Sequence, residues 1–517
     1  MPDATTGWAP HISQQLRAAK KSLQDVIADP KSDPNVMKCL IEAEAEILER
    51  DISEITTLLR SWKNGFAPIN RLPPEILTTI PHFSDGRRRH RVTIALTHVC
   101  RAWREIFISR PSLWTDLCWK GAEKARTYIE RSKSSPVNVT LSLNGKLSPH
   151  HIFFQVIPRT TGRLKSLTMH GPSEYPKDVA DHLSNPEPLL ECLEMNKFTT
   201  PISGLFAGDL SSLRNLRLSH LNIELSWRNM TNLTSVRLHT ISPPIPVAQL
   251  LDCFEGAPLL RTIRLTDAIS TSDTQDDRLI SLASLKTMKI NGRAPCAPLF
   301  DHLSIPVGTK LDIISKSFDP SYENIFPGSP GNLKNLVNFT TVGFQFKTGL
   351  SSARFSGPNG DLLMTSELPE ADISTALEYL DRLDSSATEQ LVIVGGGSLP
   401  ADVVHRVLRS MQDLRTLKIH KGEHQYTFID SLTPQPQPSS VVVCPRLEGL
   451  SLTPCRNEEK SAIQSMIRMA ASRASRGAKL ETIKIMRARG KFDLEDVLEL
   501  EEHVLRMEFD GDVASNG

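Results

Sequence analysis

The sequence of 517 residues predicts an α/β protein with two parts, a helical amino-terminal module and a long solenoid with a curved parallel sheet. Two observations support this prediction. The first 118 residues contain a helix with heptad-spaced apolar residues and a second helix that begins at paired prolines. From residue 164 to residue 485, the pattern Leu-x-x-apolar-x-apolar recurs, with short helical patterns between its occurrences. Strand, turn and helix therefore alternate along most of the chain, as a solenoid requires.

Residues 37–64 predict one amphipathic helix, preceded by a flexible segment over residues 1–36. Its apolar residues follow one another at alternating steps of four and three, which is the heptad spacing of a helix that packs on another helix. The intervening faces are rich in Glu and Asp. Most amphipathic helices bury such a stripe on their own protein, so we expect this arrangement, with a coiled coil as the alternative. The stripe consists of Ile41, Ala45, Leu48, Ile52, Ile55, Leu59 and Trp62.

Residues 67–118 form the next predicted unit. "LPPEIL" is a strong helix start, because proline lacks only a backbone donor that would be unpaired in the first turn. Pro81 ends this helix, and apolar residues at helical spacing return between Ile94 and Ile106. A unit of about 50 residues buries only a modest fraction of its apolar surface. We therefore expect a partner or the following domain to cover some of it.

The segment "INRLPPEIL…THVCRAWREIFISRPSLWTDL" resembles the F-box motif, in particular that of large basidiomycete families. The resemblance covers the whole of residues 67–118, although Pro81 and the basic "RRRHR" loop depart from the family pattern. It implies docking on the Skp-type adaptor of a cullin–RING ubiquitin ligase. By position, the residues that face or support the adaptor are Leu72, Pro73, Ile76, Leu77, Val99, Cys100 and Trp103.

The repeated pattern occurs nine times, beginning with "LKSLTM" at residue 164 and ending with "LETIKI" at residue 480. About two or three matches would arise by chance in this length. The steps of 20–33 residues bracket the leucine-rich-repeat period, so residues 119–491 predict an irregular leucine-rich-repeat solenoid. Between 291 and 388 the pattern blurs into an irregular repeat or insertion, with "KLDIIS", "FTTVGFQF" and "QLVIV" as degenerate strands. Residues 492–517 predict an acidic tail that becomes disordered toward its end.

Basic residues occupy six of the nine fifth positions of the repeat. If positions four and six face the core, position five faces the open, concave side of the sheet, because side chains alternate along a strand. Cations on parallel strands ~4.8 Å apart repel one another and favour an anionic partner. The alternative is a solvated row of long side chains. The candidate residues for binding an acidic or phosphorylated target are Arg217, Arg237, Arg264, Lys289 and Lys418.

Other chemistry has little support in the sequence. "LVIVGGGSLPADVVHRVL" resembles a dinucleotide turn, but Pro400 stands where the third glycine belongs, so a structural turn is the preferred interpretation. His150, His151, Asp276 and Asp277 lack ligand spacing, and no cysteine has a catalytic signature. We expect no catalytic site, metal or cofactor. Basic clusters at 87–91 and 468–491 lack interleaved aromatics, so we do not expect nucleic acid as a partner.

Taken with the resemblance, the sequence predicts the substrate-receptor subunit of a Skp–cullin–F-box ubiquitin ligase, whose repeats bind the target. The alternative is a leucine-rich-repeat scaffold without a ligase role, and an oxidoreductase built around residues 391–420 is a remote third. Eight scattered cysteines and the lack of a signal or membrane-spanning pattern predict a cytoplasmic or nuclear protein.

Overall fold

The structure is a computed structural model in which the chain forms two compact units. Unit 1 comprises Met1–Asp116 with Glu130–Ser135, and unit 2 comprises Leu117–Ile129 with Pro136–Gly517. The residues that the structure describes are 14, 17–22, 24, 25, 28, 33–84, 89–118, 122–142, 156–171, 181, 183–202, 204–223, 229–270, 277–316, 330–347, 350–366, 377, 380, 383–395, 399–421, 425–435, 441–453, 459–486, 492–509, 513 and 514. Among them, no helix combines the length and the apolar character needed to cross a membrane.

From Pro34 to Trp114, the elements of unit 1 that the structure describes are all helices. Its elements are α2 (Pro34–Gly65), η1 (Pro68–Arg71), α3 (Pro74–Thr79), η2 (Ile80–Phe83), α4 (Arg89–Leu96), α5 (Arg101–Ser109) and η3 (Pro111–Trp114). The helix predicted over 37–64 is therefore present as α2, which begins at Pro34 with the Asp33 carboxylate accepting from Asn35 N at 2.9 Å. The expectation that this helix is buried on its own protein is wrong, because none of its residues is buried. Most of the predicted flexible segment 1–36 lies outside the described residues.

The prolines define the short helices that follow α2. Pro74 is the first residue of α3, and the helix ends at Thr79 because Pro81 lies in the 3-10 turn η2. The helical spacing over Ile94–Ile106 is divided between α4 and α5. Cys100 is extended, with φ −159°, and precedes the first turn of α5.

The core of unit 1 is small and rich in tryptophan. Leu77, Trp103, Phe107, Leu113 and Trp114 are all buried. The Trp103 and Phe107 rings stack with centroids 5.7 Å apart, and Trp114 Nε1 donates to the Phe107 carbonyl at 2.8 Å. Each of these side chains contributes roughly 1.5–3 kcal/mol by leaving water. Few residues therefore carry the stability of this unit.

Over the residues described, unit 2 is built on a sheet of 17 strands, most of them parallel. Hydrogen-bonded neighbours follow the order β2-β3-β4-β5-β6-β7-β9-β11-β14-β13-β12-β15-β16-β17-β18-β20. The first part contains β1 (Asp116–Cys118), β2 (Val137–Ser142), β3 (Leu164–His170), β4 (Cys192–Ile202), β5 (Asn215–Ile223), β6 (Ser235–Ser242), β7 (Thr262–Thr266), β9 (Thr287–Gly292) and β11 (Thr309–Ser315). The second part contains β12 (Thr341–Lys347), β13 (Leu350–Gly357), β14 (Gly360–Ser366), β15 (Gln390–Val394), β16 (Thr416–His420), β17 (Gly449–Thr453), β18 (Thr482–Ile485) and β20 (Arg506–Phe509).

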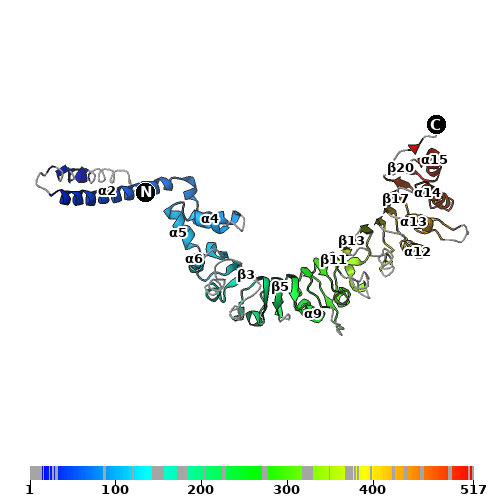
Figure 1. Ribbon diagram of the computed structural model, residues 1–517, viewed down its shortest axis with the longest axis horizontal. Helices are drawn as coiled ribbons and strands as arrows, with labels where there is room; N and C mark the ends of the chain where they lie inside the picture. Colours follow the sequence, from blue (N-terminus) through cyan, green and yellow to red (C-terminus); the bar gives the residue numbers. More distant parts are fainter. Residues whose placement is uncertain are drawn as a thin grey trace. The chain divides into compact units, whose positions relative to one another are not determined.

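The strands of unit 2 follow an arc, with helices on its outer side (Figure 1). These include α9 (Val247–Glu255), α12 (Ala401–Ser410), α13 (Gln425–Leu432), α14 (Glu459–Ala474) and α15 (Leu494–His503). The remaining elements are α6 (Ala122–Ser132), η4 (Leu205–Gly208), α10 (Ala297–Phe300), η7 (Pro330–Asn332), η8 (Lys334–Leu336) and the short pairs β8 (Ile280–Ser281) with β10 (Leu303–Ser304) and β19 (Phe492–Asp493) with β21 (Val513–Ala514).

The repeated sequence pattern corresponds to a repeated structural unit. At β6, the leucine of position one (Leu233) and the residues of positions four and six (Val236, Leu238) are buried, and the corresponding residues of the other eight units are buried as well. A left-handed residue recurs three positions after the fifth residue of the pattern, at Lys197, His220, Thr240, Asp267 and Lys421, with φ between 45° and 64°. Asp267 and Lys421 directly follow β7 and β16, whereas Lys197, His220 and Thr240 lie within β4, β5 and β6. The same backbone path therefore recurs in several repeats, although none of these residues is glycine.

The blurred region between 291 and 388 continues the sheet without a break. "KLDIIS", "FTTVGFQF" and "QLVIV" lie in β11, β12 and β15, as predicted. The sequence did not predict β13 and β14, which pair antiparallel with each other and connect β11 to β12. Gly360, at φ +144°, allows the tight turn between them, since a Cβ there would lie 2.6 Å from the Thr309 carbonyl oxygen.

The acidic tail predicted from residue 492 contributes a helix and a strand to unit 2. Leu494–His503 form α15, and Arg506–Phe509 form β20, which extends the sheet beside β18. Val497, Leu500 and Val504 are buried. These apolar residues bind the acidic segment to unit 2 in spite of its charge.

Candidate functional site

Two surfaces contain the residues that the sequence singled out, one in each unit. The first is the apolar surface of unit 1, defined by Leu72, Pro73, Ile76 and Val99. Leu72 is 41% exposed, Ile76 51% and Val99 56%, and Pro73 is also exposed. Exposed large apolar side chains grouped in one small unit are typical of an interaction site.

The other predicted adaptor residues lie beneath or beside this surface. Leu77 and Trp103 are buried, at 1% and 4% exposure, and Cys100 is half-buried. Leu77 and Trp103 therefore support the surface and cannot contact a partner directly. The structure thus separates residues of the motif that are available for binding from residues that hold the unit together.

Hydrogen bonds fix the segments that carry the apolar surface. Trp103 Nε1 donates to Asn70 Oδ1, and Asn70 Nδ2 donates to the Asn64 carbonyl at 2.5 Å. The side chain of Asn70 therefore connects the end of α2 to the core of unit 1. On α3, Glu75 Oε1 accepts from Arg110 Nη2 at 2.7 Å. The apolar surface is consequently presented on a braced backbone, which lowers the entropic cost of binding.

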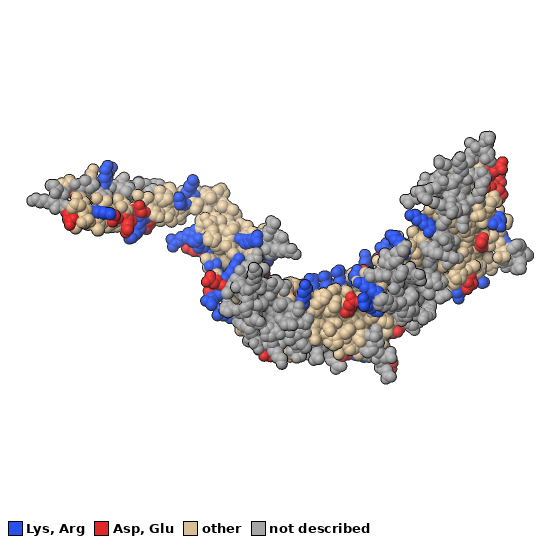
Figure 2. Space-filling view, viewed as in Figure 1, with Lys and Arg blue, Asp and Glu red and all other residues tan. Residues whose placement is uncertain are grey.

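The second surface is a row of four cations, Arg217, Arg237, Arg264 and Lys289, which we call the cation row. These residues are direct register partners on the parallel strands β5, β6, β7 and β9. Their neighbours along each strand are buried, so the cations lie on the open face of the sheet. Lys and Arg side chains gather along the inner side of the arc of unit 2 (Figure 2).

Carboxylates pair with both ends of the cation row. Arg217 Nη1 lies 3.2 Å from Glu194 Oε2 on β4, and Lys289 Nζ lies 2.7 Å from Asp312 Oδ2 on β11. Both acids occupy the corresponding register positions of their strands. Sequence reasoning missed the role of Asp312, although its alternation with Leu311 and Ile313 in "KLDIIS" places it on the same face.

The two central arginines differ from the ends of the row. Among the described residues, no carboxylate lies within ion-pair distance of Arg237 or Arg264. The pKa of Arg237 is lowered, first by partial burial and then by the positive charges of Arg217 and Arg264. A bound anion would relieve this repulsion, so the centre of the row is the place where an anionic group gains most.

Hydroxyl groups lie beside the cation row. Ser235, Thr262 and Thr287 are register partners two residues before Arg237, Arg264 and Lys289. Two residues after Arg237, His239 is exposed, and its ring contacts that of His220 at a centroid distance of 4.7 Å. This face therefore offers cationic groups together with neutral hydrogen-bond donors.

Lys418 does not belong to this group. It lies on β16, and five strands (β11, β14, β13, β12 and β15) separate it from β9. Its register partners are Val392 and Ser451. Farther along, Lys484 pairs with Glu508 at 2.6 Å, on the strand that the predicted tail forms. The predicted binding residues are thus four neighbours and one distant lysine.

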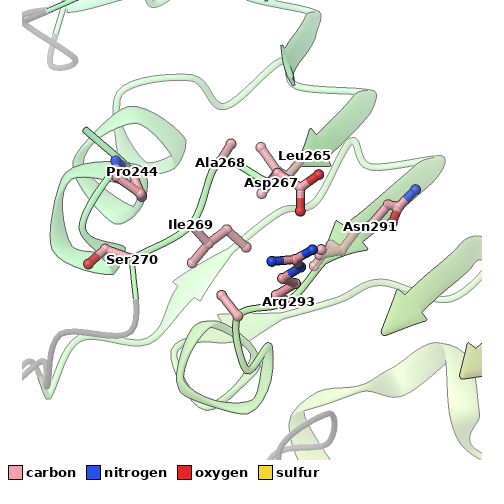
Figure 3. Close-up of a pocket in the computed structure, with 11 residues that line it drawn as sticks. Pro244, Leu265, Asp267, Ala268, Ile269, Ser270, Asn291 and Arg293 are labelled. Carbon is pink, nitrogen blue, oxygen red and sulfur yellow. The ribbon is translucent and has the colours of Figure 1, made fainter. Parts of the chain in front are cut away.

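A cavity of about 360 Å³ opens beside the ends of β7 and β9. Leu265, Ile269 and Ile290 contribute apolar walls, and Figure 3 shows Asp267 and Arg293 from neighbouring strand ends lining it together. Asp267 is one of the left-handed residues that recur in the repeats, and it directly follows β7. The lining residues include neither histidine nor cysteine, and Ser270 and Asp267 supply the hydroxyl and the carboxylate among them.

The remaining candidate motifs have structural roles. Gly395 has φ +77°, and a Cβ at this position would lie 2.2 Å from the Phe346 carbonyl oxygen, so "GGG" begins a turn that requires glycine. Gly396 and Gly397 lie outside the described residues, as do His150, His151 and Asp276. Within the described residues, no group of three or more His, Cys, Asp or Glu is placed to hold a metal ion.

Three buried cysteines and one buried arginine also have structural roles. Burial raises the pKa of Cys253, Cys296 and Cys444 to about 12, which keeps these thiols protonated and unreactive. Arg473, within the basic cluster 468–491, is buried and donates to the carbonyls of Val443 and Cys444 at 2.8 and 2.9 Å. That cluster is therefore not a continuous basic surface.

The sequence matches no protein-family model and no curated protein.

Proposed function

We propose that the chain is an F-box protein with a leucine-rich-repeat solenoid, and that it acts as the substrate receptor of a Skp–cullin–F-box ubiquitin ligase. In this proposal unit 1 binds the adaptor, and the sheet of unit 2 binds the target protein. The chain performs no chemistry of its own. It raises the effective concentration of a target lysine near the ubiquitin carrier.

The observation that carries the proposal is the division of the motif residues in unit 1. The sequence "LPPEIL…VCRAW" resembles the F-box, and its Leu72, Ile76 and Val99 are exposed apolar side chains above a core that contains Leu77 and Trp103. When a partner covers such residues, the complex is stabilised by roughly 25 cal/mol per Å² of apolar area removed from water.

The cation row supports an acidic or phosphorylated segment as the target. Arg237 and Arg264 are neighbouring cations on a rigid sheet without an ion pair among the described residues, and arginine binds carboxylate and phosphate through two parallel hydrogen bonds. The target segment would cross the strands and place its anionic groups at the centre of the row. Lys418 remains a candidate for a separate contact farther along the sheet.

Co-purification with a Skp-type adaptor tests the adaptor half of the proposal. The Ile76→Asp variant should lose the adaptor, because a carboxylate replaces an exposed apolar contact while the core remains intact. Leu259→Asp is the matched control, since Leu259 is a similarly exposed apolar residue (47%) in unit 2. Adaptor that co-purifies equally with wild type and Ile76→Asp, or with neither, would refute this half and favour the scaffold alternative.

Anionic peptides test the target half. Binding of polyglutamate and of a serine-phosphorylated peptide library should weaken at least tenfold in Arg237→Glu/Arg264→Glu, because both central cations are reversed. Lys310→Glu is the control, since Lys310 already lies near Asp361 at 3.9 Å. Equal binding by wild type and the double variant would remove the cation row as the target site and leave the adaptor assignment unaffected.

A further inference from the structure

The helix α2 carries a continuous apolar stripe, of which Leu48 and Ile55 are half-buried and the other large members are exposed. It is 32 residues long, and none of its residues is buried. Ile52 is 53% exposed and Trp62 55% exposed, and Ile41 and Leu59 are exposed as well. These residues belong to one heptad series, so they lie along a single side of the helix. The stripe from Ile41 to Trp62 is about 32 Å long at 1.5 Å per residue.

The charges beside the stripe all have the same sign in its amino-terminal half. With Ala45, Ile52 and Leu59 at position a and Ile41, Leu48, Ile55 and Trp62 at position d, the flanking positions e and g hold Glu42, Glu44, Glu49 and Asp51. Glu42 lies 3.8 Å from Lys38. In the part of the chain that the structure describes, Glu44, Glu49 and Asp51 form no ion pair.

This charge pattern disfavours parallel pairing with a second copy of the chain. In a parallel pair, position g of one helix faces position e of the next heptad of its partner, which brings Glu44 against Glu49. Like charges at these positions destabilise a coiled coil. In an antiparallel pair that overlaps the whole stripe, e faces e and g faces g, so Glu42 faces Lys63, whereas Glu44, Glu49 and Asp51 face Gly65, Thr56 and Leu58. A second copy therefore offers one cation to four carboxylates, and a helix with basic flanking residues complements the stripe better.

We propose that α2 binds, in trans, an amphipathic helix with a heptad apolar stripe flanked by Lys or Arg. Such a helix covers the apolar stripe and pairs with the four carboxylates that bracket it. The interaction is independent of adaptor binding, because it uses α2 and not the apolar surface of unit 1.

The chain's own basic segment is too short to replace this partner. Residues 12–27 contain Arg17, Lys20 and Lys21, but a helix over this range that folded back from Pro34 would extend only to about residue 49 of α2. Ile52, Ile55, Leu59 and Trp62 would remain uncovered.

A charge-reversed copy of the full chain is a direct probe for this surface. We call Glu42→Lys/Glu44→Lys/Glu49→Lys/Asp51→Lys the reversed chain. Light scattering after gel filtration should give the monomer mass for wild type alone and for the reversed chain alone. An equimolar mixture should give a complex of twice that mass. The complex should weaken strongly near 1 M salt, where the screening length falls to about 3 Å.

Controls separate the other outcomes. Ile52→Asp in the reversed chain should abolish the mixed complex while circular dichroism remains unchanged. A dimer of wild type alone that Ile52→Asp disrupts would overturn the proposal in favour of self-association. A mixture that stays monomeric would overturn it as well, and recovery of the complex on deletion of residues 1–32 would then identify the chain's own segment as the occupant.

Discussion

The two units expose opposite kinds of side chain over cores of very different size. Unit 1 leaves Leu72, Ile76 and Val99 in water above a core of a few aromatic and aliphatic residues. Unit 2 buries the apolar positions of every repeat and carries exposed or half-buried cations on its open face, with Arg237 and Arg264 at the centre of a row and unpaired within the described part of the chain. Each surface departs from an ordinary protein surface in its own way, the first by apolar exposure and the second by like-charge proximity.

The difference shows how each surface is tied to stability. In unit 1 the exposed motif residues contribute little to folding, because the buried Leu77 and Trp103 carry the packing. In unit 2 the cation row slightly destabilises the folded state, since the arginines repel one another. The core that extends along the entire sheet offsets this destabilisation. Binding should therefore be separable from folding in both units.

The largest expected effect tests the small core of unit 1. Trp103→Ala should destabilise unit 1 by about 3–5 kcal/mol, because it removes a buried aromatic ring and its hydrogen bond to Asn70. Hydrogen exchange measured by mass spectrometry should show loss of amide protection in α3 and α5, with unit 2 unchanged. Ile76→Ala should leave the protection of α3 within experimental error. Equal loss in both variants would mean that the exposed residue also carries the fold.

The next largest effect is a loss of stability on substitution of a glycine in unit 2, compared with a control glycine in the same unit. Gly395→Ala should cost about 2–4 kcal/mol, since it places a Cβ against the Phe346 carbonyl oxygen at a left-handed φ. Gly343→Ala is the control, because a Cβ added there would meet no atom within 4 Å and the φ of Gly343 is not in the left-handed region. Urea denaturation followed by circular dichroism measures both changes. A neutral result for Gly395→Ala would contradict the close approach.

Arg264→Gln should separate stability from binding in the cation row. Removing one of two neighbouring charges should leave stability unchanged or raise it by about 0.2–1 kcal/mol, because the repulsion with Arg237 is relieved. The same change should weaken the binding of polyglutamate several-fold. Isothermal titration and urea denaturation on one preparation compare the two quantities. Destabilisation together with unchanged binding would reverse our interpretation of the row.

The smallest effect concerns pH. The pKa of His220 is lowered, first by burial and then by the charges of His239 and Lys197, so its ring protonates only below its ordinary value of 6.5. The neutral form favours the folded state, and its stabilising contribution is lost as pH falls through the lowered pKa. Protonation also adds positive charge beside His239, which lies two residues after Arg237 on β6, so polyglutamate binding should strengthen about two- to threefold below pH 6.5.

The His220→Gln variant is the control for this pH effect. It should show a smaller increase in polyglutamate binding over the same pH range, because one titrating ring is absent. Titrations at several pH values and constant ionic strength measure the difference between the two proteins. Identical pH profiles would show that His220 does not influence the row.

Much of the fold could be predicted from local patterns. The heptad spacing predicted α2, the paired prolines predicted the start of α3, and the recurrence of leucine predicted parallel strands with alternating buried and open positions. The register of Arg217, Arg237, Arg264 and Lys289 also followed from the pattern, because each cation occupies the same place in its repeat. Repetition makes these features visible, since one spacing rule applies to every unit.

The chain alone determined which residues alternate between core and surface, because the periods of strands and helices are fixed by backbone geometry. Only the tertiary structure decided which of them remain uncovered and which charges meet. It placed Glu194 and Asp312 at the ends of the cation row, separated Lys418 by five strands, inserted β13 and β14, and ordered residues 494–509 against the sheet. These outcomes depend on contacts between residues distant in sequence, and no local spacing contains them.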